Sequence, residues 1–186
     1  MDLVADVPKV QREQCNGVPD SDVVVRSGPF AVRYMSMTRP ELISLWSQLR
    51  RFRTLFSDLT RGDLGNFIRY VISGDTFWLE ILDGKERVGI VMLDGVSRLV
   101  EAEAHVLFLD SELMKKVPVC RATMAWLFDN FPFHRLTVQV PQRYFATLRL
   151  VEAIGFKREG RKRQATLLNG KWHDNYLFGI VRSEVK

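Results

Sequence analysis

Three ionisable side chains lie in a row on one face of a predicted strand. Apolar and polar residues alternate through residues 100–110, which places Glu101, Glu103 and His105 together and puts two alanines and a valine on the opposite face. Carboxylates and imidazoles commonly act as general bases, and removal from water raises the pKa of a carboxyl toward the range that this role needs. The row could therefore deprotonate a substrate. In the alternative interpretation, Glu101 is solvated at the strand end and His105 is a core histidine with satisfied hydrogen bonds.

The other residues that could bind a metal or act as nucleophiles are scattered. His105, His134 and His173 and the two cysteines, Cys15 and Cys120, show no spacing typical of metal ligands, so we expect no metal site. Cys120 opens an apolar helical stretch without an adjacent base, which is typical of a buried thiol and not of a nucleophile. The sequence also lacks a glycine-rich phosphate loop of the Walker or Rossmann kind.

The hydrophobic pattern predicts the elements that must position the row. Alternation with period two predicts strands, spacing of three to four residues predicts helices, and Asn169-Gly170 is a strong signal for a two-residue hairpin turn. The predicted order is strand, two helices, three strands, helix, strand, helix and two strands. The corresponding residues are 30–35, 42–56, 64–71, 76–82, 87–93, 100–110, 120–131, 134–140, 143–154, 156–168 and 171–181.

Composition indicates one globular domain of ordinary kind. The chain has 186 residues, of which 46% are hydrophobic and 26% charged, and at this length a core forms without disulfides or metal. Residues 1–28 lack sustained periodicity and are expected to form a loosely ordered arm before a domain at 29–186. No apolar run is long enough to span a membrane, and Asp2 and Asp6 stand where a secretory signal would carry positive charge. We therefore expect a cytoplasmic protein with reduced thiols.

The net charge of +5 is concentrated near the C-terminus. Residues 157–171 hold six basic side chains and one acid, Glu159. Such a cluster suits phosphates or acidic surfaces, but it is equally typical of the solvated face of a hairpin. Without interleaved aromatic residues it is a weak signal for nucleic acid, and we do not expect a nucleic-acid partner. The residues that such a partner would contact are Lys157, Arg158, Arg161, Lys162 and Arg163.

The C-terminal third resembles the GNAT acyltransferases, and within them the ribosomal-protein N-terminal acetyltransferases. The resemblance rests on Gly155-Phe156 after the last helix, Glu159-Gly160 after that pair, and the hairpin 168–174, which ends in Asp174 before the final strand. Together with the element order it covers about residues 30–184. It implies an α/β (α+β) GNAT fold, in which a mixed, mostly antiparallel central sheet of about seven strands is flanked by four helices.

The resemblance also implies an activity and a set of site residues. GNAT enzymes transfer an acetyl group from acetyl-CoA to an amine, so the expected partners are acetyl-CoA and an amine acceptor, with a monomer or homodimer both possible. Glu103 matches the glutamate that many relatives carry on this strand, which makes it the preferred base and His105 the second. The cofactor residues implied are Leu107, Leu109, Lys115, Lys116, Val117, Val119, Cys120 and Tyr144. The acceptor residues implied are Glu101, Trp172 and Asp174.

One loop and one single residue depart from the family pattern. Relatives begin the helix after the central strand with Gln or Arg and two small residues that let phosphate oxygens approach backbone amides, whereas this chain reads Met114 to Val119, with Pro118 lacking an N–H. Val151 stands where many relatives have the tyrosine that protonates the leaving thiolate. The sequence thus supports two hypotheses. One is an acetyl-CoA-dependent N-acetyltransferase acting on a protein N-terminus or small amine. The other is an inactive GNAT-fold binding or assembly protein, of a kind that a virus could encode.

Overall fold

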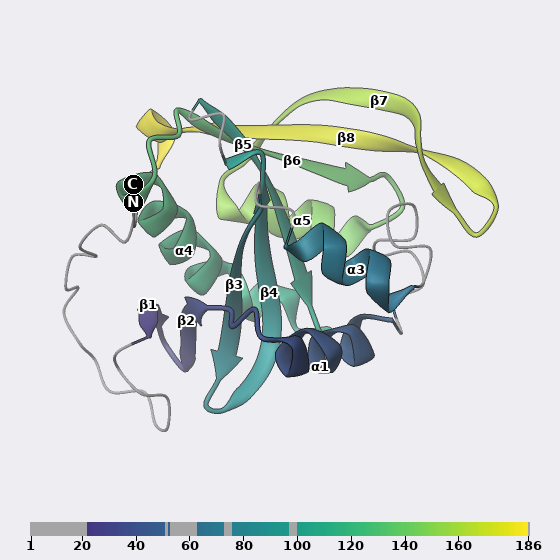
Figure 1. The fold of residues 1–186 in the computed structure, drawn as a ribbon. Coiled ribbons are helices and arrows are strands. Elements are labelled where there is room, and N and C mark those ends of the chain that lie inside the picture. The colour runs from purple at the N-terminus through teal and green to yellow at the C-terminus, as the bar shows by residue number, and fades with distance from the viewer. Residues whose placement is uncertain (1–21, 51, 53–62, 73–75, 97–99, 186) are drawn as a thin grey trace.

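A mixed eight-stranded sheet organises the molecule (Figure 1). The computed structural model describes residues 22–50, 52, 63–72, 76–96 and 100–185. The strands are ordered β1-β2-β3-β4-β5-β6-β8-β7, and every neighbouring pair is antiparallel except β5–β6. Their bounds are β1 Val23–Ser27, β2 Phe30–Tyr34, β3 Thr76–Asp83, β4 Glu86–Asp94, β5 Glu101–Phe108, β6 Arg135–Pro141, β7 Lys157–Leu168 and β8 Lys171–Val181.

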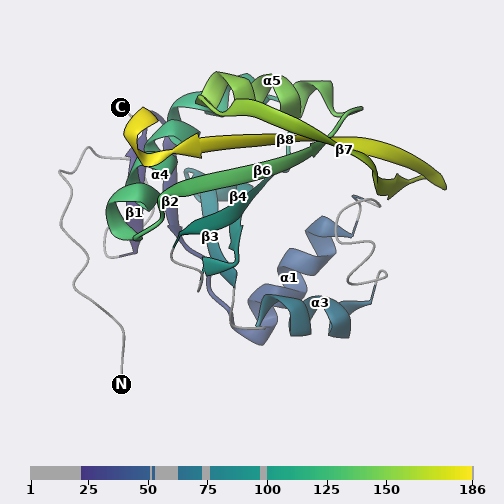
Figure 2. The same cartoon turned by 90° about the horizontal axis from the view of Figure 1, so that it is seen from above.

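The described residues form four α-helices, which cover the two faces of the sheet. Figure 2 shows α1 and α3 on one side and α4 and α5 on the other. Two short 3-10 helices, η2 and η3, complete the described elements. Each face has its own apolar core: one packs beneath α1 and α3, the other beneath α4 and α5. The bounds are α1 Arg39–Leu49, α3 Leu64–Val71, η2 Leu113–Lys116, α4 Val117–Asn130, α5 Phe145–Ile154 and η3 Arg182–Glu184.

Local sequence signals fix several element ends where they were expected. Pro40 lies in the first turn of α1, and the Asp63 side chain caps α3 by accepting the N–H of Asn66 at 2.8 Å. Gly155 ends α5 with φ +123°, a conformation that favours glycine. Asn169 and Gly170 both have positive φ in the tight β7–β8 turn. The predicted continuation of the first helix to residue 56 lies outside the described residues.

The first strand, β1, differs from the prediction, which assigned residues 1–28 to a loose arm and gave about seven strands. Val23–Ser27 pairs with β2 across a turn at Gly28, whose φ is +58°. The pairing register shifts between Val23 and Val25, and Val24 and Val25 are both buried. At this irregularity two consecutive side chains point inward, so the segment lacks the alternation of apolar and polar residues that predicts a strand.

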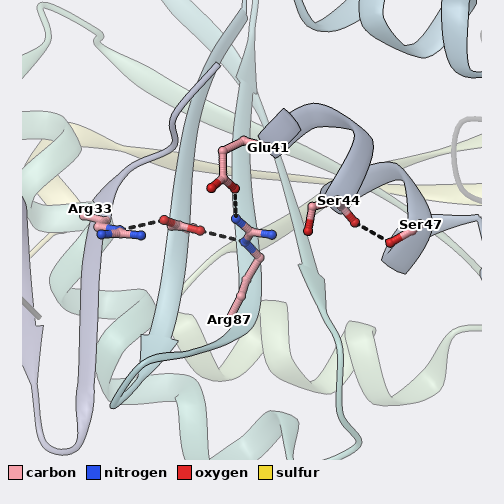
Figure 3. Close-up of polar contacts among 6 residues, drawn as sticks. Arg33, Glu41, Ser44, Ser47 and Arg87 are labelled. Carbon is pink, nitrogen blue, oxygen red and sulfur yellow. Dashed lines mark hydrogen bonds and ion pairs between the residues drawn. The ribbon is translucent and has the colours of Figure 1, made fainter. Parts of the chain in front are cut away.

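A buried carboxylate ties α1 to the sheet (Figure 3). Glu80 on β3 is 2% exposed and lies between two arginines of the neighbouring strands. Its two oxygens accept Nε–H bonds from Arg33 and Arg87, each at 2.6 Å. Arg87 Nη2 also reaches Glu41 Oε2 on α1 at 3.4 Å. The network therefore fixes the start of α1 over β2, β3 and β4.

Candidate functional site

The sheet opens between β5 and β6. These strands pair in parallel only over Glu101↔Arg135, Ala102↔Leu136 and Glu103↔Thr137. Beyond Glu103, β5 continues to pair with β4 and β6 continues to pair with β8. We call this opening the splay. It leaves one edge of β5 free to bond an extended ligand.

The backbone groups of β5 that face the splay alternate with those that bond β4. Leu109 donates its N–H to the Val88 carbonyl at 2.9 Å. Because bonded and non-bonded pairs alternate along an antiparallel ladder, Leu107 also faces β4. Leu107 and Leu109, implied as cofactor residues, therefore turn their backbone groups toward β4, and the groups that face the splay belong to Ala104, Val106 and Phe108.

An apolar cavity of about 60 Å³ lies on the α4–α5 side of the splay. A single water molecule needs roughly 10–15 Å³, so the cavity is larger than one water and has room for a short apolar chain. The wall contains Val151, which stands where many relatives have a tyrosine. The lining residues include Ala104 and Val106 from β5, Val138 from β6, Cys120 from α4, and Val151 and Ile154 from α5.

Glu103 and His105 lie on the opposite face, at the closed end of the splay. Glu103 Oε1 is 4.0 Å from His105 Nε2, and Glu103 Oε2 accepts an N–H of Gln139 at 3.1 Å. Lys162 in turn donates to Gln139 Oε1 at 3.2 Å. The Glu103 side chain is 31% exposed, so an incoming group can reach it. The predicted row thus has the expected orientation, with its carboxylate held in a hydrogen-bonded chain.

Two further groups complete this cluster. Asp94 is the register partner of Glu103 on β4, and residues directly opposite on one face of a sheet have neighbouring side chains. Tyr70 on α3 lies near both: burial first, and then the Asp94 and Glu103 charges, raise the pKa of Tyr70 to about 12. Burial also lowers the pKa of His105, against the opposing effect of Glu103 and Asp94. The ring is 43% exposed, which limits that lowering.

The sequence offered no sign of Asp94 or Tyr70 as site residues. Asp94 ends a strand, and Tyr70 lies between Arg69 and Val71 in a short helix whose apolar positions predict only packing. Only the β4–β5 register and the packing of α3 on the sheet bring them to Glu103. A register is set by pairing between strands and not by the pattern within either one.

The start of α4 has few free donors for a phosphate. The helix follows η2 without a break, and the N–H of Val117 is bonded to the Met114 carbonyl. Pro118 has no N–H to offer, and the N–H of Lys115 is bonded to the Glu112 carbonyl. Val119 is fully buried in the core beneath α4 and α5. The N–H of Val117, implied as a cofactor residue, is therefore not free for a phosphate, and the side chain of Val119, the second residue implied here, packs in the core.

The two lysines before α4 are bound to carboxylates of their own chain. Lys116 is 2% exposed, donates to Asp110 Oδ1 at 2.6 Å and lies 5.3 Å from the centre of the Phe108 ring. Lys115 is on the surface and donates to Glu112 Oε1 at 2.5 Å, which raises its pKa. Lys116 points into the protein, so the expectation that it binds cofactor phosphates is corrected. Lys115 stays a candidate, beside a groove of about 250 Å³ that Met114, Ala146 and Arg149 also line.

Of the three residues implied as acceptor contacts, Trp172 and Asp174 line one surface pocket, whereas Glu101 is not among its lining residues. Glu101 bonds to Arg135 at 3.2 Å, and Arg135 also binds Glu159 at 2.5 Å, so Glu101 belongs to an ion-pair group at the strand end. Asp174 lies on β8, where it binds Arg161 at 2.7 Å and accepts the N–H of Gln164 at 2.8 Å.

An aromatic surface pocket lies next to Asp174. Trp172 is 60% exposed and lines this pocket of about 280 Å³ together with Phe145 and Arg143. Tyr144, implied as a cofactor contact, precedes α5 and packs partly against the core.

The basic strip of β7 is largely engaged within the chain. Lys157 binds Glu184, Arg158 stacks on the Tyr176 ring, Arg161 binds Asp174, and Lys162 binds Gln139. The pattern is that of a hairpin face whose cations serve the fold, which was one of the two interpretations of this strip.

In the described ranges, no group of three or more His, Cys, Asp or Glu side chains could hold a metal ion. No helix of the part that the structure describes is long and apolar enough to cross a membrane.

Cys120 is expected to resist alkylation in the folded protein. Burial raises the pKa of its thiol to about 12, so at pH 8 the thiolate is about 10³-fold rarer than for a free cysteine. Iodoacetamide labelling followed by mass spectrometry of a Cys15→Ser variant measures this. We expect modification of Cys120 only after urea unfolds the chain, and complete modification of the folded protein within minutes would contradict the burial.

The site fits one part of a coenzyme A thioester better than the other. The free edge of β5 and the apolar cavity suit a pantetheine arm and its thioester, which present amides and methylenes. The first turn of α4 suits a pyrophosphate less well, because the N–H of Val117 is bonded to the Met114 carbonyl and Pro118 has no N–H.

Comparisons with known proteins agree with this architecture. No protein-family model matches the chain. A probable N-acetyltransferase of Bacillus subtilis, YjcK, is 28% identical over 64 residues, which are 34% of this chain and 35% of that protein. The match thus spans about a third of the curated relative.

Solved structures resemble nearly the whole chain at low identity. The ribosomal L7/L12 α-N-protein acetyltransferase in complex with coenzyme A has a TM-score of 0.71 at 14% identity, over 86% of this chain and 98% of its own. A spermidine N-acetyltransferase chimera from Vibrio cholerae has 0.72 at 14%, over 85% and 98%. The ribosomal-protein-S5-alanine acetyltransferase of Vibrio fischeri has 0.66 at 15%, over 87% and 98%. With the splayed sheet and its flanking helices, these likenesses show that the chain has the fold of the GNAT N-acetyltransferases.

Proposed function

We propose that this protein is an N-acetyltransferase that moves an acetyl group from a pantetheine thioester, acetyl-CoA among them, to a primary amine. The observation that carries the proposal is the splay between β5 and β6. It has an apolar cavity on one side of the sheet and the Glu103 carboxylate on the other, at its closed end. An acyl group held in the splay is thereby presented to a base across the sheet.

The chain's own groups can bind and deprotonate the amine. A primary amine arrives mostly as an ammonium ion, and the carboxylates of Asp94 and Glu103, on neighbouring strands, attract it. Glu103 accepts the proton, directly or through a water molecule, while Gln139 holds its second oxygen. The amine nitrogen then bonds to the acyl carbon and the C–S bond breaks. The second proton, which the new amide nitrogen must lose, passes to the leaving thiolate or to water.

The leaving thiolate needs no strong acid from the protein. A free thiol has a pKa near 8.5, so the thiolate is a stable leaving group near neutral pH. Val151 lines the cavity at the position where many relatives have a tyrosine, and it donates no proton. The main contribution of the protein to the reaction is therefore the base that deprotonates the amine.

The acceptor class is a protein amino terminus or a small amine. Of the structural neighbours, one is named for the α-amino group of a ribosomal protein and another for spermidine. Both acceptors are primary amines, which is the chemistry that the paired carboxylates of Asp94 and Glu103 suit. We carry over that shared chemistry and neither specific acceptor.

The proposal is tested by incubating the protein with isotope-labelled acetyl-CoA near 1 mM and a panel of peptides and polyamines. We expect labelled acetyl amide in at least one acceptor, detected by mass spectrometry, and heat of donor binding in calorimetry. Absence of both product and binding heat would exclude the enzyme.

The start of α4 favours a second candidate, an inactive GNAT-fold protein that uses the fold for binding or assembly. The continuous η2–α4 turn and Pro118 leave little room for the phosphate contacts of the family. Such a protein would show no acetyl transfer to any amine in the panel. Calorimetry and the transfer assay together therefore distinguish the two candidates.

A further inference from the structure

The inner and outer parts of the donor site differ in the groups that they offer to a ligand. Its inner part keeps a free strand edge at Ala104 and Val106 and an apolar cavity behind them. Its outer part, at the first turn of α4, offers neither the N–H of Val117, which is bonded to Met114, nor one from Pro118. A ligand that enters the splay is therefore bound mainly through its inner arm.

Side-chain charge does not replace the missing amides. Lys116 is buried against Asp110 and faces the Phe108 ring, away from solvent. Lys115 is exposed, but Glu112 binds it and lines the same groove between η2 and α5. A phosphate placed there would meet the Glu112 carboxylate along with Lys115, so these two charges largely cancel. Arg149 on α5 also lines the groove, which leaves a single net positive charge where an intact cradle would offer several backbone donors.

We propose that the donor site recognises the acyl-pantetheine arm and gains little from the adenosine diphosphate part of coenzyme A. This inference rests on the proposed function for its reaction but concerns a separate property, the source of binding energy. Each charge-assisted hydrogen bond to a phosphate is worth about tenfold or more in affinity, so an intact cradle would make the nucleotide part decisive. Without it, a pantetheine thioester on a carrier protein and one on coenzyme A present the same recognised arm.

The experiment compares acetyl-CoA, acetyl-4′-phosphopantetheine and acetyl-pantetheine by calorimetry and by transfer to one amine acceptor. We expect Kd values for the first two within about threefold of each other and similar transfer rates at saturation. An acetylated acyl carrier protein forms a fourth arm, and a higher kcat/KM with it than with acetyl-CoA would identify a protein-bound arm as the preferred source.

The outcomes separate this inference from the proposed function. If acetyl-CoA binds more than tenfold tighter than acetyl-4′-phosphopantetheine and transfer occurs, the inference is overturned and the function stands. Equal affinities without transfer to any amine would keep the inference and overturn the function. If none of the donors binds, both are overturned.

Lys115→Ala provides a second, independent measurement. If the nucleotide part contributes little, this variant changes the Kd of acetyl-CoA by less than about twofold, as does the matched surface variant Lys171→Ala in the β7–β8 hairpin. A loss of tenfold or more with Lys115→Ala alone would show that Lys115 holds a phosphate, which would overturn the inference. Lys115 is exposed, so neither variant is expected to impair folding.

Discussion

Replacing Glu103 with glutamine is expected to lower the rate of acetyl transfer by about 10² or more while donor affinity stays nearly unchanged. Glutamine keeps the size of the side chain and its contact with Gln139 but cannot accept a proton. The donor site lies on the other side of the sheet, in the cavity behind Ala104, so the substitution does not touch it. We therefore expect kcat to fall and the Kd of the donor to stay nearly the same.

Steady-state kinetics with a fixed amine and calorimetry with acetyl-CoA measure the two quantities separately. Glu86→Gln is the matched control, because Glu86 is an exposed carboxylate at the start of β4, and its activity should equal that of the parent protein. An unchanged rate with Glu103→Gln would exclude this carboxylate as the base. His105 would then be the remaining candidate in the row.

The pH profile distinguishes the two bases further. Burial lowers the pKa of His105, so a reaction that depends on neutral His105 would lose activity only below about pH 6.5, the ordinary value for histidine. In that case His105→Asn would remove the acidic limb of kcat/KM together with most of the rate. If Glu103 is the base, His105→Asn keeps the shape of the profile.

The sequence predicted the faces of β5 but not its neighbours. Period-two alternation was enough to put Glu103 and His105 on one side, because side-chain direction depends on position within the strand alone. Asp94 entered the site only through the β4–β5 register. Leu107 was among the implied cofactor residues, but which peptide groups of β5 face the splay depends on the register with β4, which the pattern within β5 does not contain.

Charge was harder to interpret from the sequence than hydrophobicity. Two adjacent lysines before a helix suggested a phosphate site, but Lys116 turns inward to Asp110 at 2.6 Å. Glu80 lies in an otherwise apolar strand and gave no sign of its two arginine partners, which come from separate strands. The sequence pattern around a charged residue does not indicate which residue it pairs with. A buried ion pair can therefore be identified only in the folded chain.

Glu80→Gln is expected to lower the free energy of unfolding by about 3 kcal/mol, near the lower end of what removing one partner of a buried ion pair costs. The Glu80 side chain is 3% exposed and Arg87 is 11% exposed, so the substitution leaves the Arg87 guanidinium largely buried opposite a neutral amide. Its remaining anionic partner is the more exposed Glu41, at 3.4 Å. Arg33 is 33% exposed and can turn to water, which keeps the loss from being larger. Urea denaturation measures the difference, with the exposed Glu86→Gln as a control expected within about 0.5 kcal/mol of the parent.

A double variant, Glu80→Leu with Arg87→Leu, should be less destabilised than the two single variants together, because it leaves no unpaired charge between β3 and β4. A loss below about 1 kcal/mol for Glu80→Gln would mean that the network under α1 does not hold the sheet and helix together.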